Sequence, residues 1–134
     1  MLGLDGSEGA CAAASWCAVF ASAIRAAVIA VAVYTQQIEL IPEDDPSSVY
    51  AYFQRKLHSA WTAPLHAADV HVETRLMRDI RASDSLRRTA NEADADAIIV
   101  GNHRVGRLVH LRAGGNALRL LHTTNVPLVL VPPT

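Results

Sequence analysis

The C-terminal part of the chain most narrows the choice of fold, because residues 97–132 read as one continuous unit of strand, loop, helix and strand. Residues 97–101 are a short β-branched run that ends in Gly101, which is typical of a buried parallel strand. A loop follows and leads into a helix over residues 108–122, and residues 126–131 form a second apolar strand. Because a helix joins the two strands, we expect them to be parallel.

This unit also has an unusual charge. From residue 97 to the C-terminus there is no acidic residue, and the arginines are Arg104, Arg107, Arg112 and Arg119. A glycine-containing loop before a helix exposes backbone N–H groups at the positive end of the helix dipole. The segment is therefore suited to an anionic ligand.

The spacing of the glycines is specific. Gly101 is followed after two residues by Arg104, and nine more residues separate Arg104 from Gly114 and Gly115. Near the N-terminus, the turn of residues 5–7 (DGS) follows a short apolar run. This pattern resembles the universal stress protein family, whose motif is glycine, two residues, glycine, nine residues, glycine, and serine or threonine. The chain departs from the motif twice, because arginine replaces the second glycine and Gly115 replaces the hydroxyl residue.

The resemblance implies ATP or a related adenine nucleotide as ligand, with Mg²⁺ needed only if ATP binds. It implies that Asp5 lies near the ribose, Val33 near the adenine, and the glycines around the phosphates. The complete set of candidate binding residues is Asp5, Val33, Gly101, His103, Arg104, Gly114 and Gly115. Arg104 has two interpretations: its side chain fills the phosphate space, or its guanidinium holds a phosphate by two hydrogen bonds. Loss of the hydroxyl at Gly115 removes one ligand contact.

The N-terminal segment needs testing as a membrane span, because residues 9–33 carry a single charge, Arg25. A signal peptide needs basic residues before its apolar core, but Asp5 and Glu8 stand there. Alanine dominates the first half and β-branched residues the second. We therefore predict a strand shortened at Met1, a helix over residues 7–24 capped by Ser7, a tight turn, and a buried strand over residues 27–34.

The middle of the chain begins with a predicted loop over residues 35–48, whose consecutive acids are interpreted as solvated rather than metal-binding. Apolar residues four apart (Phe53, Leu57, Trp61 and Leu65) then form one stripe of a helix, which Pro64 should kink or end. Residues 69–76 alternate in polarity as a half-exposed edge strand does. Ser83 or Asp84 is predicted to cap a helix that runs to about Glu92.

Strands alternating with helices predict an α/β fold: a single domain over residues 1–134 with five parallel strands and helices on both faces of the sheet. The resemblance implies the strand order three-two-one-four-five. In such a sheet, ligands bind beyond the carboxyl ends of the strands, where the strand order reverses.

No recognisable catalytic motif is present, so we predict a binding protein rather than an enzyme. An enzyme of the same superfold remains a rival, and so does a zinc site shared by His58, His66 and His71. Cys11 and Cys17 are interpreted as two small buried residues of a protein in a reducing cytoplasm, with a redox pair across a dimer as the alternative. A nucleic-acid binder is disfavoured, since residues 97–134 contain no aromatic side chain.

The last strand, residues 127–131, is apolar on both faces and is predicted to form a sheet edge. The resemblance implies that two copies pair antiparallel through this strand, and Pro127 and Pro132 would bound the pairing segment. The sequence therefore predicts a small dimeric stress-response or signalling module in the cytoplasm. It either responds to an adenine nucleotide or, without nucleotide, acts through contacts with partner proteins that the sequence does not identify.

Overall fold

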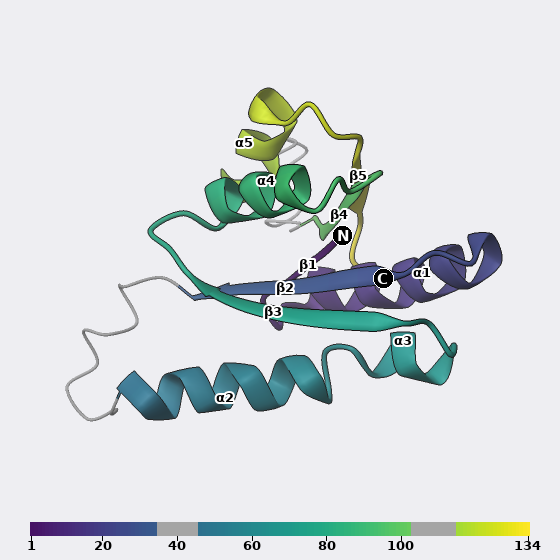
Figure 1. Cartoon of the computed structure of the whole chain (residues 1–134), viewed down its shortest axis with the longest axis horizontal. Helices are drawn as coiled ribbons and strands as arrows, with labels where there is room; N and C mark the ends of the chain where they lie inside the picture. The colour runs from purple at the N-terminus through teal and green to yellow at the C-terminus, as the bar shows by residue number, and fades with distance from the viewer. Residues whose placement is uncertain (35–45, 103–114) are drawn as a thin grey trace.

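The computed structural model describes residues 1–34, 46–102 and 115–134, and its centre is a five-stranded parallel sheet (Figure 1). The strands are β1 (Leu2–Leu4), β2 (Val28–Tyr34), β3 (Val72–Arg78), β4 (Ile98–Gly101) and β5 (Leu128–Val131). Their spatial order is β3-β2-β1-β4-β5. The predicted fold class, the strand order and the short first strand are confirmed.

Helices cover both faces of this sheet. They are α1 (Glu8–Ile24), α2 (Pro46–His58), α3 (Ala63–Ala67), α4 (Ala82–Glu92) and α5 (Gly115–Thr123). In Figure 1, α4 and α5 lie together on one side of the sheet, while α1, α2 and α3 lie on the other. Each layer of helices buries its own apolar cluster against the strands.

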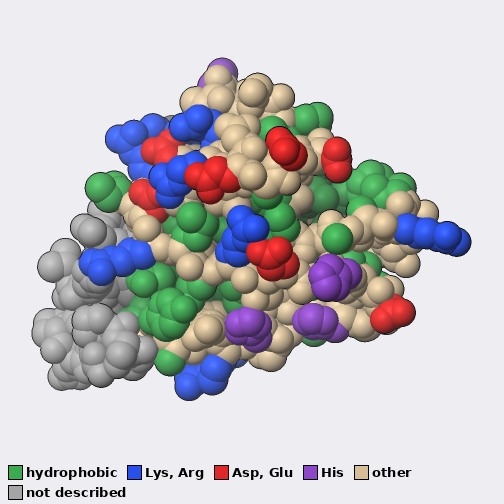
Figure 2. All heavy atoms as spheres, in the orientation of Figure 1, with side chains coloured by type: hydrophobic (Ala, Val, Ile, Leu, Met, Phe, Trp, Pro, Cys, Tyr) green, Lys and Arg blue, Asp and Glu red, His purple; other side chains and the backbone are tan. Residues whose placement is uncertain are grey.

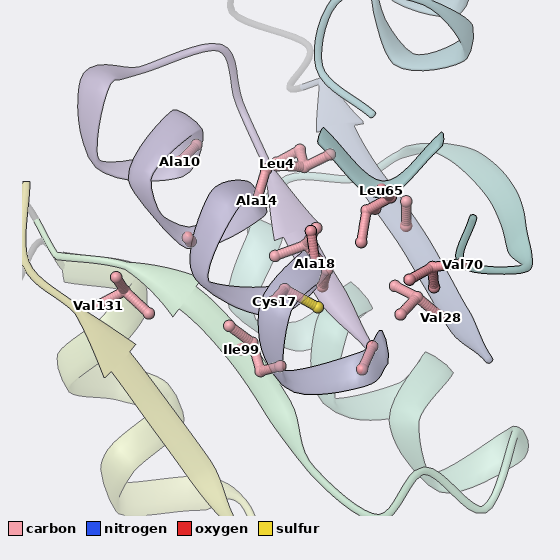
Figure 3. Packing of buried hydrophobic residues seen from close by; sticks show 14 of the residues in the cluster. Leu4, Ala10, Ala14, Cys17, Ala18, Val28, Leu65, Val70, Ile99 and Val131 are labelled. Carbon is pink, nitrogen blue, oxygen red and sulfur yellow. The ribbon is translucent and has the colours of Figure 1, made fainter. Parts of the chain in front are cut away.

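The two clusters differ in the size of their side chains. On the α1 face the helix contributes mainly alanines, and these pack against Leu4, Leu65, Ile99 and Val131 (Figure 3). On the other face, larger side chains fill the core, and they include Val31, Leu86, Ile98 and Leu120. Small side chains allow a helix backbone to approach the strands closely, so the alanine-rich sequence of α1 is explained by its packing.

The first helix begins and ends as the sequence predicts. The hydroxyl of Ser7 accepts a hydrogen bond from the N–H of Ala10 at 3.2 Å, which is an N-cap contact. Arg25 ends the helix in the left-handed conformation, with φ of 56°. Cys17 is buried, but Cys11 is exposed, so the interpretation of two buried cysteines is wrong for Cys11. Within the described residues, no helix combines the length and the hydropathy that a membrane span requires.

The helix predicted around the stripe from Phe53 to Leu65 is two helices. α2 ends at His58, and Pro64 stands in the first turn of α3, where its missing N–H breaks no helical hydrogen bond. The buried hydroxyl of Thr62 donates to the carbonyl of Leu57 at 2.8 Å and joins the two helices. Pro64 therefore starts a helix rather than ending one. Two residues of the predicted apolar stripe, Leu57 and Leu65, are buried.

The predicted cap of α4 is also wrong. The helix begins at Ala82, after Arg81, whose side chain makes no capping hydrogen bond. Asp79 takes that role from just beyond β3: its carboxylate accepts from the hydroxyl of Ser85, and from the backbone of Ile80 at 2.7 Å. The polar side chains of Ser83 and Asp84 suggested a cap within the helix. The carboxylate that accepts these hydrogen bonds instead belongs to Asp79, three residues before α4 begins.

Asp79 makes the stability of the fold depend on pH. The hydrogen bond from Ser85, with those from two backbone N–H groups and the charge of Arg88, lowers the pKa of Asp79 below its ordinary value. A carboxyl group with a lowered pKa stabilises the fold above its unfolded pKa, about 3.9, and the contribution is lost as pH falls through the folded value.

We therefore expect Asp79→Asn to lower the urea midpoint at pH 6, and this effect should shrink as the pH falls through the folded pKa of Asp79, below which both proteins carry a neutral group. Glu92→Gln, at an exposed position at the end of α4, controls for the loss of one acidic charge. Equal destabilisation by Asp79→Asn above and below that pKa would contradict this account.

Candidate functional site

A cavity of about 270 Å³ opens at the carboxyl ends of β1, β2 and β4. Strands β2 and β3 lie on one side of β1 in the sheet, and β4 and β5 lie on its other side. The strand order therefore reverses between β1 and β4. Parallel sheets bind ligands at this kind of position, because the loops after neighbouring strands separate there. The starts of α1, α4 and α5 also contribute to the cavity wall.

The structure brings four of the seven candidate residues to this one cavity. Asp5 follows β1, Val33 lies near the end of β2, Gly101 ends β4, and Gly115 begins α5. The other three candidates, His103, Arg104 and Gly114, lie outside the described residues. Residues separated by up to 110 positions in the sequence therefore line a common space.

The turn after β1 is held by a close aromatic contact. The carboxylate of Asp5 accepts a hydrogen bond from the N–H of Ser7 at 2.9 Å, and Gly6 has a φ of +80°, which favours glycine. A Cβ atom at Gly6 would lie 2.6 Å from the ring of Trp61. The sequence predicted only that Trp61 lies on the apolar stripe of a helix, because its position against this turn depends on the tertiary fold.

Gly101 has a structural role as well as a place in the cavity wall. A Cβ atom there would lie 2.1 Å from the carbonyl carbon of Gly9, in the first turn of α1. A Cβ atom at Gly9 would in turn lie 2.8 Å from the carbonyl oxygen of Asn102. The two glycines let β4 and α1 meet backbone to backbone. Sequence reasoning missed Gly9, although a glycine in the first turn of an alanine-rich helix could have indicated it.

The remaining wall is mostly apolar, with polar groups at one side. Its apolar lining includes Val31, Leu86, Val100 and Leu120. Sequence reasoning also missed the polar lining residues Ser7 and Asn116. An apolar cavity with a few converging polar groups is the usual form of a small-molecule site. The starts of α4 and α5 both lie at its wall, and helix starts favour negative charge there.

Histidine side chains gather on the face formed by α2, α3 and β3 (Figure 2). They make separate contacts, since His58 lies 3.1 Å from the hydroxyl of Thr74 and His66 lies 3.2 Å from that of Thr62. Across residues 1–34, 46–102 and 115–134, no three histidine, cysteine or acidic side chains are arranged to hold a metal ion. The zinc site considered in the sequence analysis is therefore not formed by His58, His66 and His71.

Comparisons with known proteins agree with the family that the sequence pattern resembles. The sequence model of the universal stress protein family matches residues 1–132. No curated protein sequence matches the chain.

Solved structures share the fold. A universal stress family protein from Burkholderia pseudomallei has 24% identity and a TM-score of 0.74, with 99% of this chain and 93% of that chain covered. A universal stress protein in complex with cAMP has 19% identity and a TM-score of 0.78, with coverage of 99% and 95%. One from Archaeoglobus fulgidus in complex with dAMP has 17% identity and a TM-score of 0.65, with coverage of 96% and 93%. Since the family model spans nearly the whole sequence and the fold agrees, the chain belongs to the universal stress protein family.

Proposed function

We propose that this chain is a cytoplasmic binding module whose ligand is an adenine nucleotide, held in the cavity at the carboxyl ends of β1, β2 and β4. The observation that carries the proposal is the meeting of Asp5, Val33, Gly101 and Gly115 at that one cavity. Similar folds in complex with cAMP and dAMP add support, because both ligands contain adenine. The two free thiols, Cys11 and Cys17, suit a reducing compartment.

The apolar part of the cavity suits a planar base. Val31 and Val33 of β2 and Leu86 of α4 contribute side chains there, and they offer an uncharged surface for an aromatic ring. Asp5 supplies a carboxylate at the end of β1, and carboxylate oxygens accept hydrogen bonds from ribose hydroxyls. We assign the base to the first group and the sugar to the second.

The starts of α4 and α5 give the cavity an end that favours an anion. We assign the phosphate to that end. The cavity volume, about 270 Å³, is near the lower limit of typical ligand pockets, which is about 300 Å³. A monophosphate therefore fits better than a triphosphate, whose outer phosphates would extend beyond this volume.

The test is a calorimetric titration of protein stripped of co-purified nucleotide, with AMP, cyclic AMP and Mg-ATP in turn. We expect micromolar binding of AMP and cyclic AMP, and weaker binding of Mg-ATP. Val33→Phe should weaken all three by filling the base region. Val19→Ala, at a position that is 73% exposed on α1, is the matched surface control.

A result without binding heat from any nucleotide would reject this proposal, provided that the protein is folded. It would favour the alternative function, a nucleotide-free module that acts through protein contacts. Hydrolysis of ATP during the titration would instead favour the rival enzyme.

We also propose that two copies assemble through β5, because β5 ends the described sheet and its outer edge has no neighbouring strand there. The adjacent surface of α1 supports this proposal. Trp16 and Phe20 stack with ring centroids 5.0 Å apart and are each about 40% exposed. They lie about 200° around the helix from the alanines at positions 14 and 18, which face Leu65 (Figure 3).

The aromatic pair therefore lies on the flank of α1 toward β5, which α1 contacts. The helix carries no charged residue between Glu8 and Arg25. A second copy related by a two-fold axis through the β5 edge would bring the same uncharged flank alongside, without repulsion between like charges.

A further inference from the structure

The turn of residues 5–7 connects the cavity with an aromatic side chain outside it. Asp5 and Ser7 both line the cavity, whereas Gly6 and Trp61 are not among the described lining residues. A Cβ atom at Gly6 would lie 2.6 Å from Cζ2 and 3.2 Å from Nε1 of the Trp61 indole. The indole therefore packs against the Gly6 backbone, while the residues on either side of Gly6 face the cavity.

Trp61 is held in place by contacts that do not involve this turn. It lies between α2 and α3, and its backbone N–H donates to the carbonyl of Lys56 at 2.9 Å. Its ring meets that of Phe53 edge to face, with the ring centroids 5.6 Å apart. The next residue is the fully buried Thr62, whose hydroxyl donates to the carbonyl of Leu57. The indole thus gives the turn a support that is built into the connection between α2 and α3.

The direction of the Asp5 carboxylate depends on this turn. The N–H of Ser7 donates to that carboxylate at 2.9 Å, and Gly6 between them has a φ of +80°. Glycine adopts many backbone conformations, so a turn centred on it has little fixed shape of its own. Asp5 and Gly6 are both exposed. The Trp61 ring therefore supplies a tertiary contact that restricts the middle of the turn.

We propose that Trp61 is a positioning residue, which holds the Asp5 carboxylate in the direction that ribose hydroxyls need and so makes the site select a sugar that carries them. The inference rests on the proposed function, in which Asp5 meets the ribose. Hydrogen bonds weaken steeply when their distance and angle change. A turn without its aromatic support would therefore lose the sugar contact. The base, which is assigned to side chains of β2 and α4, would keep its own contacts.

A purely structural role for Trp61 makes a different prediction. In that case the residue would only help to pack the connection between α2 and α3 against the apolar cluster on the α1 face. Its truncation would lower stability and weaken the binding of every ligand alike. Phe53→Leu is the matched control, because it removes the same edge-to-face contact but leaves the indole against Gly6.

The experiment titrates adenosine and 2′,3′-dideoxyadenosine, which lacks the two ring hydroxyls of the ribose, into the wild type and each variant. The wild type should bind adenosine about tenfold or more tightly than the dideoxy compound, the lower range for a hydrogen bond to a charged group. Trp61→Ala should reduce this preference to about twofold or less, because adenosine binding weakens while dideoxyadenosine binding does not. Phe53→Leu should keep the wild-type preference.

A second measurement tests whether Trp61 acts through Asp5. In an Asp5→Ala background, Trp61→Ala should weaken adenosine binding by no more than about twofold further, since residues that act through one contact are not additive. Thermal unfolding of each variant measures the structural contribution separately. Trp61→Phe keeps a ring beside Phe53 but is too short to cover Gly6 fully, so it provides the same comparison of nucleosides if the alanine variant does not fold.

An equal loss for the two nucleosides, a preference unchanged by Trp61→Ala, or an additive loss in the Asp5→Ala background would each overturn this inference while leaving the proposed function intact. A wild type that binds both nucleosides equally would overturn it in the same way. If wild-type protein binds neither nucleoside, the proposed function fails and the inference fails with it. Only a loss of preference that depends on Asp5 supports Trp61 as a positioning residue.

Discussion

Gly101→Ala will lower the free energy of unfolding by about 3 kcal/mol or more, which is a large share of the stability of a small protein. The added Cβ atom would lie 2.1 Å from the carbonyl carbon of Gly9 and 2.3 Å from its oxygen. Both neighbours are backbone atoms of α1, so no side chain can rotate away. Either α1 or β4 must move, and both pack at the centre of the fold. Urea denaturation monitored by circular dichroism measures the effect.

Gly115→Ala is the matched control, because a Cβ atom at Gly115 would have nothing within 4 Å. This substitution should change the free energy of unfolding by less than about 1 kcal/mol. The higher helix propensity of alanine contributes a stabilising part of that change. Equal stability of the two alanine variants would contradict the close approach of the Gly9 and Gly101 backbones.

This contrast bears on how the glycine pattern relates to function. Sequence reasoning assigned both Gly101 and Gly115 to the surroundings of a phosphate. In the structure both line the cavity, but only Gly101 is also required by packing. A chain could therefore lose nucleotide binding and still keep Gly101, because the contact with α1 demands it. Titration with ligand, rather than the presence of Gly101, must decide whether the site binds a nucleotide.

The fold could be predicted largely from local patterns. The β-branched run before Gly101, the alanine-rich first helix and the alternating residues around β3 all have the structure that their periodicity indicates. The strand order came from the family resemblance, because order depends on which strands pair across long separations. β1 illustrates this: it has three residues, yet it lies between β2 and β4.

Tertiary contacts explain the features that local patterns did not predict. Pro64 can end one helix or begin another, and the buried hydrogen bond of Thr62 belongs to the second arrangement. Asp79 supports the start of α4 from outside the helix. In the cavity, Asn116 and Ser83 are 33 positions apart in the sequence. Their contact forms only when α4 and α5 lie side by side.

Leu130→Pro will weaken the proposed dimer, so that it dissociates at a higher protein concentration than the wild type does. The carbonyl of Pro127 accepts from the N–H of Ile98 in β4 at 2.8 Å, and that of Val131 accepts from the N–H of Asn102, just after β4, at 2.7 Å. Odd-numbered residues of β5 therefore turn their backbone groups toward β4. Because successive residues of a strand alternate, the N–H and C=O groups of Leu128 and Leu130 face the outer edge. Proline at position 130 therefore removes an edge donor without removing a hydrogen bond to β4.

A two-fold axis doubles the effect, since each copy loses one donor to the other. Two hydrogen bonds at about 0.5–1.5 kcal/mol each correspond to a rise in the dimer dissociation constant of about fivefold to 150-fold. Leu130→Ala loses the same side chain but keeps its N–H, so it should remain dimeric. Sedimentation velocity over a concentration series compares the three proteins. A dimer that survives Leu130→Pro unchanged would show that the two copies meet elsewhere, and the exposed flank of Trp16 and Phe20 on α1 would then be the next surface to mutate.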